Sequence, residues 1–332
     1  YKRQVLYNGK AGLIDLDLNQ QQKVLNSYGY PMGLADYSAF ILGGLPKQGQ
    51  MLEEVKDLLL NEIKKLRAGE FDEKMLQANI NNFKLYELQS MESNEGRADI
   101  FVNSFINGTN WEDEVTAIDR MAKLTKEDIV AFADKYLKED NYAVVYKKQG
   151  KDPNEKKMTK PEITPIVSNR DVASPFLTSI QENAVKPIEP VFLDFKKDMS
   201  QLTAKSDIPV LYKQNTTNDL FQLIYVFDMG NNNDKALGTA FDYLEYLGTS
   251  DMTPEELKSE FYRLACTFYV SPGNERTYVV LSGLNENMPA AMQLFEKLLA
   301  DAQVNKEAYD NLVGDILKAR ADAVSYTHLR AH

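Results

Sequence analysis

The clearest pattern near the start of the chain is a short apolar run over residues 37–42 that is followed by two glycines, Gly43 and Gly44. A run of this length, closed by glycine, predicts a β-strand that ends there. Apolar side chains then recur every three or four residues over 51–66 and again over 72–88, which predicts two amphipathic helices. Gly69 lies between them, where a helix stop is expected.

A third helix is predicted over residues 125–137, because Thr125 and Asp128 have the spacing of a capping arrangement and an apolar stripe follows them. Residues 142–146 are apolar and aromatic, and they predict a closing strand. One strand, a series of helices and a final strand are typical of an α+β domain, which we assign to residues 1–147.

Residues 148–188 differ in composition from the rest of the chain. Lysine, asparagine, aspartate and proline dominate, and no apolar periodicity is present. A loop of this length inside one domain is uncommon, so we expect an extended linker here.

The alternation of strands and helices then restarts. Thr253, Pro254 and Glu256 form a strong helix start, with threonine as the cap and proline in the first turn. We assign residues 189–323 to a second α+β domain. The predicted strands are 208–212, 220–227 and 277–281, and the predicted helices are 237–247, 253–264, 288–302 and 306–323.

Composition excludes several classes of partner. The 332 residues carry 38 Lys and Arg against 49 Asp and Glu, a net charge of -11. A nucleic-acid partner requires a basic surface, and anionic membranes repel an acidic one, so neither is expected. No apolar run approaches the roughly 20 residues of a membrane-spanning helix. The single cysteine, Cys266, lies in an apolar run over 261–266 that is expected to be helical, and it is expected to be a buried structural thiol.

The two histidines of the chain, His328 and His332, both lie in its last five residues. The rest of the chain therefore has no Ser-His-Asp triad, Cys-His pair or histidine-based zinc site. Residues 324–332 resemble translated adaptor sequence, and we expect them not to belong to the fold. We also expect the chain to be truncated at both ends. A targeting segment could then be missing, so the sequence does not distinguish the cytoplasm from the bacterial envelope.

Several segments of the second half, in their order and spacing, resemble the M16 family of zinc metallopeptidases, the pitrilysin or insulinase-like group. They are Leu220–Leu223, Phe227–Gly230, Leu247–Thr249, Thr253–Leu264 and Tyr278–Leu284. The first half is similar to the second domain of that family, through Phe40–Leu42 and the paired helices around Gly69.

In catalytic members of the family, a helix equivalent to residues 237–247 carries His-x-x-Glu-His. Residues three and four apart share one helix face, so two imidazoles hold zinc while the glutamate takes a proton from the bound water. On this chain the two histidine positions are Asp242 and Tyr246, and the base position is Glu245. The further carboxylate of the family falls near Asp315. Tyrosine would have to ionise to bind zinc.

The resemblance implies an internal fragment of a two-half protease: a second domain, a hinge, and a degenerate third domain that closes a chamber around the substrate. Zinc would belong to a catalytic domain upstream in the same chain or in a partner subunit, and this chain would bind no cofactor and carry no catalytic residue. Its expected partners are peptide or small protein substrates and that catalytic domain. Each domain would be an αβ sandwich of the M16 type, in which an antiparallel sheet packs against helices, and an extended linker would join the two.

Plainer interpretations compete with each of these. Asp242 and Glu245 are expected as carboxylates on a solvated helix face rather than as metal ligands. Tyr28, Gly29 and Gly33 belong to a segment that in the family holds the N-terminal end of a substrate at a sheet edge, but an ordinary Gly/Pro turn is favoured. Two rival functions also stay open: a catalytically inactive peptide-binding or assembly subunit beside an active chain, and an acidic scaffold with no role with peptides.

Overall fold

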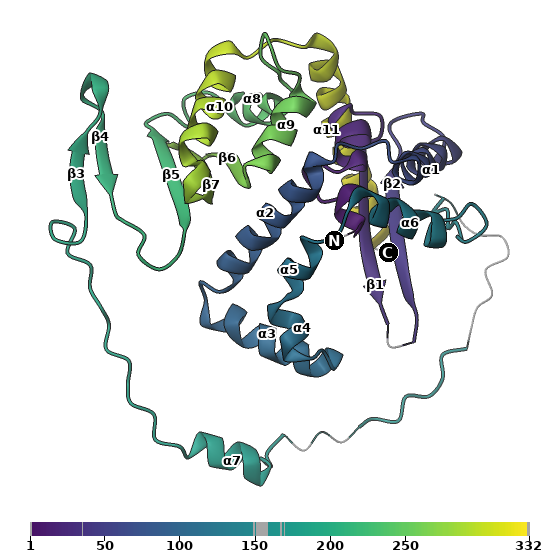
Figure 1. The fold of residues 1–332 in the computed structure, drawn as a ribbon, viewed down its shortest axis with the longest axis horizontal. Helices are drawn as coiled ribbons and strands as arrows, with labels where there is room; N and C mark the ends of the chain where they lie inside the picture. Colours follow the sequence, from purple (N-terminus) through teal and green to yellow (C-terminus); the bar gives the residue numbers. More distant parts are fainter. Residues whose placement is uncertain are drawn as a thin grey trace. The chain divides into compact units, whose positions relative to one another are not determined.

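The computed structural model describes residues 2–34, 36–148, 150, 159–166, 168 and 170–330. These residues group into two compact units (Figure 1). Unit 1 combines the described parts of 1–144 and 215–332, and unit 2 comprises those of 145–214. The fold is α+β, with small antiparallel sheets and helices, as predicted. The division into domains at residues 147 and 188 stays a prediction.

Unit 1 begins with a buried segment that has no counterpart among the predicted elements. It contains a 3₁₀ turn, η1 (Lys2–Val5), and a π-helical turn, η2 (Asp15–Gln20). Asp15 fixes the loop between them, because its Oδ2 atom accepts hydrogen bonds from three backbone N–H groups. The apolar side chains of this segment lie in the core of the first half: Val5, Leu6, Leu13, Ile14, Leu18 and Val24.

β1 (Asn26–Gly33) and β2 (Ser38–Leu45) form a two-stranded antiparallel ribbon in which Tyr28 pairs with Gly43. The strand predicted over 37–42 is confirmed, but the prediction that the glycines end it is wrong. Gly44 lies inside β2, where an added Cβ would come within 2.4 Å of Val55 Cγ1. The glycine therefore permits close packing of the ribbon on the next helix.

The helices predicted in the first half are present. They are α1 (Leu52–Ala68), α2 (Lys74–Ser90) and α6 (Lys126–Tyr136). Gly69 ends α1 with a left-handed φ of 70°, and Thr125 and Asp128 form both hydrogen bonds of a capping box at the start of α6.

Three further helices lie between α2 and α6: α3 (Asn94–Asn107), α4 (Trp111–Val115) and α5 (Ala117–Met121). The closing strand predicted over 142–146 is wrong. These residues are irregular and exposed, and no strand pairs with them among the described residues. An apolar run forms a strand only where a neighbouring strand accepts its backbone hydrogen bonds.

The second half of unit 1 is built on a three-stranded antiparallel sheet of order β5-β7-β6. β5 (Leu220–Phe227) and β7 (Thr277–Leu284) were predicted. The predicted helices α9 (Pro254–Arg263) and α10 (Met288–Asp301) pack against the sheet (Figure 1), and α9 starts at the expected Thr253 cap. α8 (Leu237–Leu244) and α11 (Lys306–Arg330) complete this half. Ala331 and His332 lie outside the described residues.

β6 (Cys266–Pro272) is a strand that the sequence pattern did not predict. The apolar run over 261–266 was expected to be helical, but α9 ends at Arg263 and the chain reverses at Ala265, which has a φ of 47°. The burial of Cys266 is confirmed, and burial raises the pKa of its thiol to about 11.

A buried polar cluster joins α2 to α9, and thereby the first half of unit 1 to the second. The Tyr262 hydroxyl donates to Asn79 Oδ1 at 2.5 Å, and Asn82 Nδ2 donates to the Tyr262 carbonyl at 2.7 Å. Beside this cluster, Leu85 of α2 packs with Leu220 and Leu284 at the end of the sheet. Polar and apolar side chains of the two halves therefore contact one another here.

Unit 2 contains α7 (Pro175–Gln181), η3 (Lys205–Asp207) and an antiparallel pair of strands, β3 (Ser200–Thr203) and β4 (Pro209–Tyr212). β4 confirms the strand predicted over 208–212, whereas α7 lies in the predicted linker and was not foreseen. In the part of the chain that the structure describes, no helix has the length and apolar character needed to cross a bilayer.

Candidate functional site

The segment that resembles a zinc-peptidase helix is not helical throughout. α8 ends at Leu244, so only Asp242 lies in it, while Glu245 and Tyr246 occupy the turn that follows. The predicted helix over 237–247 is thus three residues too long. The physical reason is the bridge between Gly248 and Gln303, in which Gln303 N donates to Gly248 O at 2.9 Å and draws the chain out of the helix.

Of the four positions singled out by the resemblance, the three carboxylates nevertheless lie near the fourth, the phenol of Tyr246. Burial raises its pKa, and the nearby carboxylates of Glu245, Asp315 and Asp242 raise it further. Asp242 and Glu245 are exposed, as expected of solvated carboxylates, and Tyr246 is half-buried. Asp315 comes from α11, so the tertiary fold brings the downstream carboxylate to the motif.

A lysine that sequence reasoning missed occupies the same neighbourhood. Lys47, in the loop after β2, places its Nζ atom 3.7 Å from Asp315 Oδ2. Burial raises the pKa of Asp315, and the ammonium of Lys47 works against that rise. No pattern in the sequence connects these two residues, because the loop and α11 meet only through the packing of the two halves.

Two glutamines of the N-terminal segment form hydrogen bonds with backbone carbonyls at this site. Gln20 of η2 is buried and donates from Nε2 to the Glu245 carbonyl at 2.9 Å. Gln22, with a left-handed φ of 49°, donates to the carbonyl of Ala308 in α11 at 3.2 Å. These two glutamines fix the turn after α8 against α11, and no sequence pattern predicted either role.

Zinc, which the family resemblance implies, does not fit these side chains. Among the residues that the structure describes, no group of three or more His, Cys, Asp and Glu side chains could hold a metal ion. Tyr246 would bind only as a phenolate, and its raised pKa opposes ionisation. The ammonium of Lys47 competes for Asp315. We therefore derive no hydrolytic step through a metal here.

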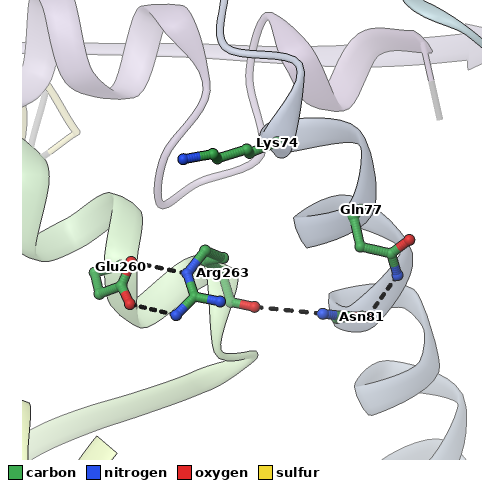
Figure 2. A pocket seen from close by; sticks show the side chains of 5 residues that line it. All are labelled: Lys74, Gln77, Asn81, Glu260 and Arg263. Atoms are coloured by element: carbon green, nitrogen blue, oxygen red, sulfur yellow. Dashed lines mark hydrogen bonds and ion pairs between the residues drawn. The ribbon is translucent and has the colours of Figure 1, made fainter. Parts of the chain in front are cut away.

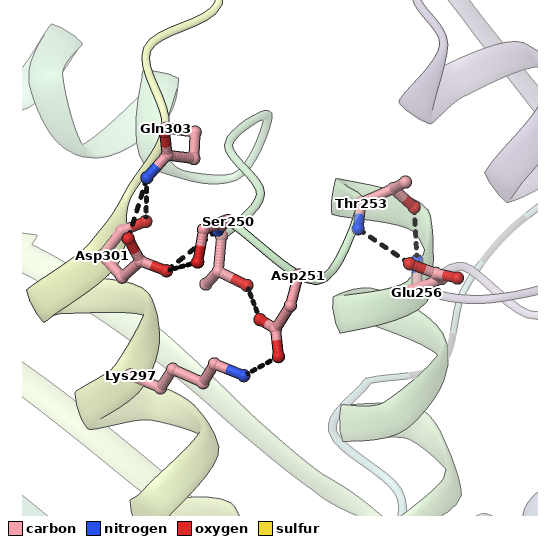
Figure 3. Close-up of polar contacts among 8 residues, drawn as sticks. Ser250, Asp251, Thr253, Glu256, Lys297, Asp301 and Gln303 are labelled. Atoms are coloured by element: carbon pink, nitrogen blue, oxygen red, sulfur yellow. Dashed lines mark hydrogen bonds and ion pairs between the residues drawn. The ribbon is translucent and has the colours of Figure 1, made fainter.

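A shallow hollow of about 520 Å³ lies beside Tyr246, next to the loop that joins α8 to α9. Polar groups in and next to it pair with one another (Figure 3). Lys297 Nζ and Thr249 Oγ1 donate to the Asp251 carboxylate at 2.5 and 2.8 Å. Ser250 Oγ donates to Asp301 Oδ2 at 2.5 Å, and Gln303 donates to the other oxygen of Asp301.

These hydrogen bonds lower the pKa of both carboxyls: the bond from Lys297 is the main cause at Asp251, and the bond from Ser250 at Asp301. A carboxylate with a lowered pKa is a weak base, so the Ser250–Asp301 pair lacks the base strength that a nucleophilic serine requires. The cluster instead fastens the α8–α9 loop to α10.

A second hollow, of about 470 Å³, opens between α2 and α9 (Figure 2). Its Arg263 guanidinium forms two hydrogen bonds with the Glu260 carboxylate, and these lower the pKa of Glu260. Asn81 Nδ2 lies 3.4 Å from the Arg263 carbonyl. The charges of Arg263 and Glu260 pair with each other, and neither group is a nucleophile or a strong base.

One buried carboxyl lies apart from both hollows. Glu62 of α1 has 2% of its side chain exposed, and its Oε1 atom accepts from Lys65 Nζ at 3.0 Å. The same ammonium donates to Asp17 Oδ2 at 2.6 Å, while Glu62 Oε2 has no hydrogen-bond partner among the described residues. Burial raises the pKa of Glu62, and the neighbouring Asp17 adds to the rise.

The segment with Tyr28, Gly29 and Gly33 is a strand, so the favoured Gly/Pro turn is wrong. The chain stays extended because every residue from Asn26 to Gly33 pairs with β2. Tyr28 stacks with Tyr30, their ring centroids 6.2 Å apart. Among the described residues β1 has no second strand beside it at its outer edge, although the Asn19 side chain binds both the N–H and the carbonyl of Ser27. Peptide binding at this edge stays a prediction.

No family model matches the chain, and no curated protein matches it either. Among solved structures, it is similar to a protease from Helicobacter pylori, with 13% identity over 37% of this chain and 30% of that one and a TM-score of 0.33. It is also similar to the periplasmic protease PqqL from Escherichia coli, with 13% identity over 96% of this chain and 37% of that one and a TM-score of 0.36.

A third similar structure is the ferredoxin protease FusC in complex with Arabidopsis ferredoxin, with 10% identity over 93% of this chain and 37% of that one and a TM-score of 0.35. The chain thus spans about a third of the length of each of these proteases. At TM-scores below 0.5 the likeness does not establish a family.

Proposed function

We propose that this chain is a non-catalytic portion of an M16 zinc metalloendopeptidase that helps to enclose and position peptide substrates. The observation that carries the proposal is the arrangement around Tyr246. The positions that match the zinc-peptidase motif lie near Asp315, the expected downstream carboxylate. Their side chains are nevertheless suited to hydrogen bonds and ion pairs rather than to zinc.

In this proposal the chain is an internal fragment. Residues 1–147 are a second M16 domain, 148–188 a hinge, 189–323 a degenerate third domain, and 324–332 a tail derived from an adaptor. Both domains are αβ sandwiches of the family type. Zinc and hydrolysis belong to a catalytic M16 domain upstream or in a partner subunit. The edge of β1 beyond Ser27, where no second strand lies, is the place where an extended peptide would add a strand.

The first test is the zinc content of the purified full chain, by mass spectrometry after metal loading and desalting. Because imidazole is a strong zinc ligand, the matched variant carries His328→Ala and His332→Ala. We expect this variant to retain less than about one zinc per ten chains. One zinc per chain, lost on changing Asp242 to Ala, would contradict the proposal.

The second test is peptide binding without cleavage. A fluorescein-labelled extended peptide is mixed with the chain, its anisotropy is followed, and its integrity is checked by mass spectrometry. We expect the anisotropy to rise and the peptide to stay intact. Cleavage that a chelator abolishes would assign catalysis to this chain, and a complete lack of binding would remove the role in substrate positioning.

A further inference from the structure

α3 carries a stripe of apolar side chains that are exposed over most of their length. Ala98, Phe101, Val102, Phe105 and Ile106 follow the spacing of one helix face. Such a stripe normally faces a core, but Ser104 is the only buried residue of the helix. Phe105 is 87% exposed and Ile106 is 71% exposed.

α4 widens this apolar area. Trp111 stacks on Phe101, with the ring centroids 4.6 Å apart and the planes inclined by 16°. Val115 lies one helical turn beyond Trp111 and is also exposed. We call the combined area the α3–α4 surface, formed by Phe101, Val102, Phe105, Ile106, Trp111 and Val115. A contiguous exposed apolar area is typical of an interaction site.

The charges that surround this surface are mostly negative. Residues 92–120 contain seven carboxylates and two arginines. One of the arginines, Arg120, is already paired with Asp113 at 2.7 Å. Two copies of this acidic surface would repel each other, whereas a basic partner would be attracted and oriented. The acidic residues are Glu92, Glu95, Asp99, Glu112, Asp113, Glu114 and Asp119.

We propose that the α3–α4 surface docks an amphipathic helix of a partner protein, with apolar residues at helical spacing flanked by Lys and Arg. The stripe from Ala98 to Ile106 runs for about 12 Å along α3, which matches two to three turns of a partner helix. The apolar residues would supply most of the binding free energy and the acidic rim would set partner choice. This docking site does not depend on the proposed protease role.

The probe is a fluorescein-labelled amphipathic helix of 18 residues, composed of Leu and Lys, added to the full chain at low salt. A peptide with the same Leu positions and Glu in place of Lys is the matched probe. We expect the Lys peptide to bind at least about tenfold more tightly than the Glu peptide, and its affinity to fall as salt is added.

Phe105→Asp separates docking from simple charge attraction. The substitution adds a negative charge, so a purely electrostatic attachment of the Lys peptide would be strengthened. We expect instead a loss of at least about tenfold, because an apolar contact is removed. Val304, 86% exposed and outside the surface, gives the matched control Val304→Asp, which should leave the affinity unchanged. Ile106→Asp repeats the test at a second position.

Four outcomes would overturn the proposal. Equal affinity for the Lys and Glu peptides would remove the stated partner chemistry. An affinity unchanged by both Phe105→Asp and Ile106→Asp would place binding elsewhere. Self-association in sedimentation that Phe105→Asp abolishes would make a second copy the occupant. Binding to phosphatidylcholine vesicles that Phe105→Asp abolishes would make a lipid surface the occupant.

Discussion

Changing Tyr262 to Phe tests the polar cluster that joins α2 to α9. The Tyr262 side chain is buried, and its hydroxyl donates to Oδ1 of the fully buried Asn79 at 2.5 Å. The substitution removes one oxygen atom and keeps the ring. Any loss of stability therefore reports on the hydrogen bond rather than on packing.

The expected magnitude follows from what remains at Asn79. Its Nδ2 atom already lacks a hydrogen-bond partner among the described residues, and the substitution removes the hydroxyl that Oδ1 accepts from. A buried polar group that loses its partner costs about 1–3 kcal/mol. No cavity forms, and Asn82 still donates to the backbone carbonyls of Tyr262 and Ala78, so the joint weakens without separating.

The assay is urea unfolding at 25 °C, followed by circular dichroism, on the wild type and the variant. The matched control is Tyr269→Phe, because Tyr269 is 53% exposed and should change the free energy of unfolding by less than about 0.5 kcal/mol. Asn79→Ala and the double variant complete a cycle with Tyr262→Phe. We expect the two effects to be non-additive by about 0.5 kcal/mol or more.

Two results would refute this reasoning. If Tyr262→Phe costs no more than Tyr269→Phe, the buried hydroxyl does not stabilise the contact between α2 and α9. If the effects of Tyr262→Phe and Asn79→Ala simply add, the two side chains do not act together.

Three further predictions concern buried groups. The raised pKa of Glu62 means that its contribution to stability is present below the ordinary carboxyl pKa and is lost as pH rises through the folded-state value. Glu62→Gln should therefore raise the urea midpoint at pH 8 and match the wild type near pH 4. With a thiol pKa of about 11, Cys266 should react with a disulfide reagent at pH 8 only after unfolding in urea. Gly44→Ala should cost about 1–3 kcal/mol in the same unfolding assay, because the new Cβ would overlap Val55, whereas Gly238→Ala, where no atom lies within 4 Å, should not.

The helices were the most predictable part of the fold. Caps such as Thr125 with Asp128 and Thr253 with Glu256 act within a few residues, so the sequence carries their whole cause. β6 was missed because its start depends on the reversal at Ala265, and an alanine with a positive φ has no signature in a single sequence.

The candidate site shows a similar split. The motif positions and Asp315 were named from the resemblance, and the structure places them around Tyr246. Lys47 and Gln20 were not named, although both contact the site. Each comes from the first half of the chain, and a contact of that range depends on how whole elements pack rather than on spacing.

By itself, the sequence determined the class of fold, most of the helices, the burial of Cys266 and the lack of histidine in the body of the chain, because residue type, periodicity and caps act locally. Only the tertiary structure decided where α8 ends, which charge faces Asp315, and that the apolar stripe of α3 stays exposed. Those features follow from long-range packing, in which one side chain meets another that no local pattern can specify.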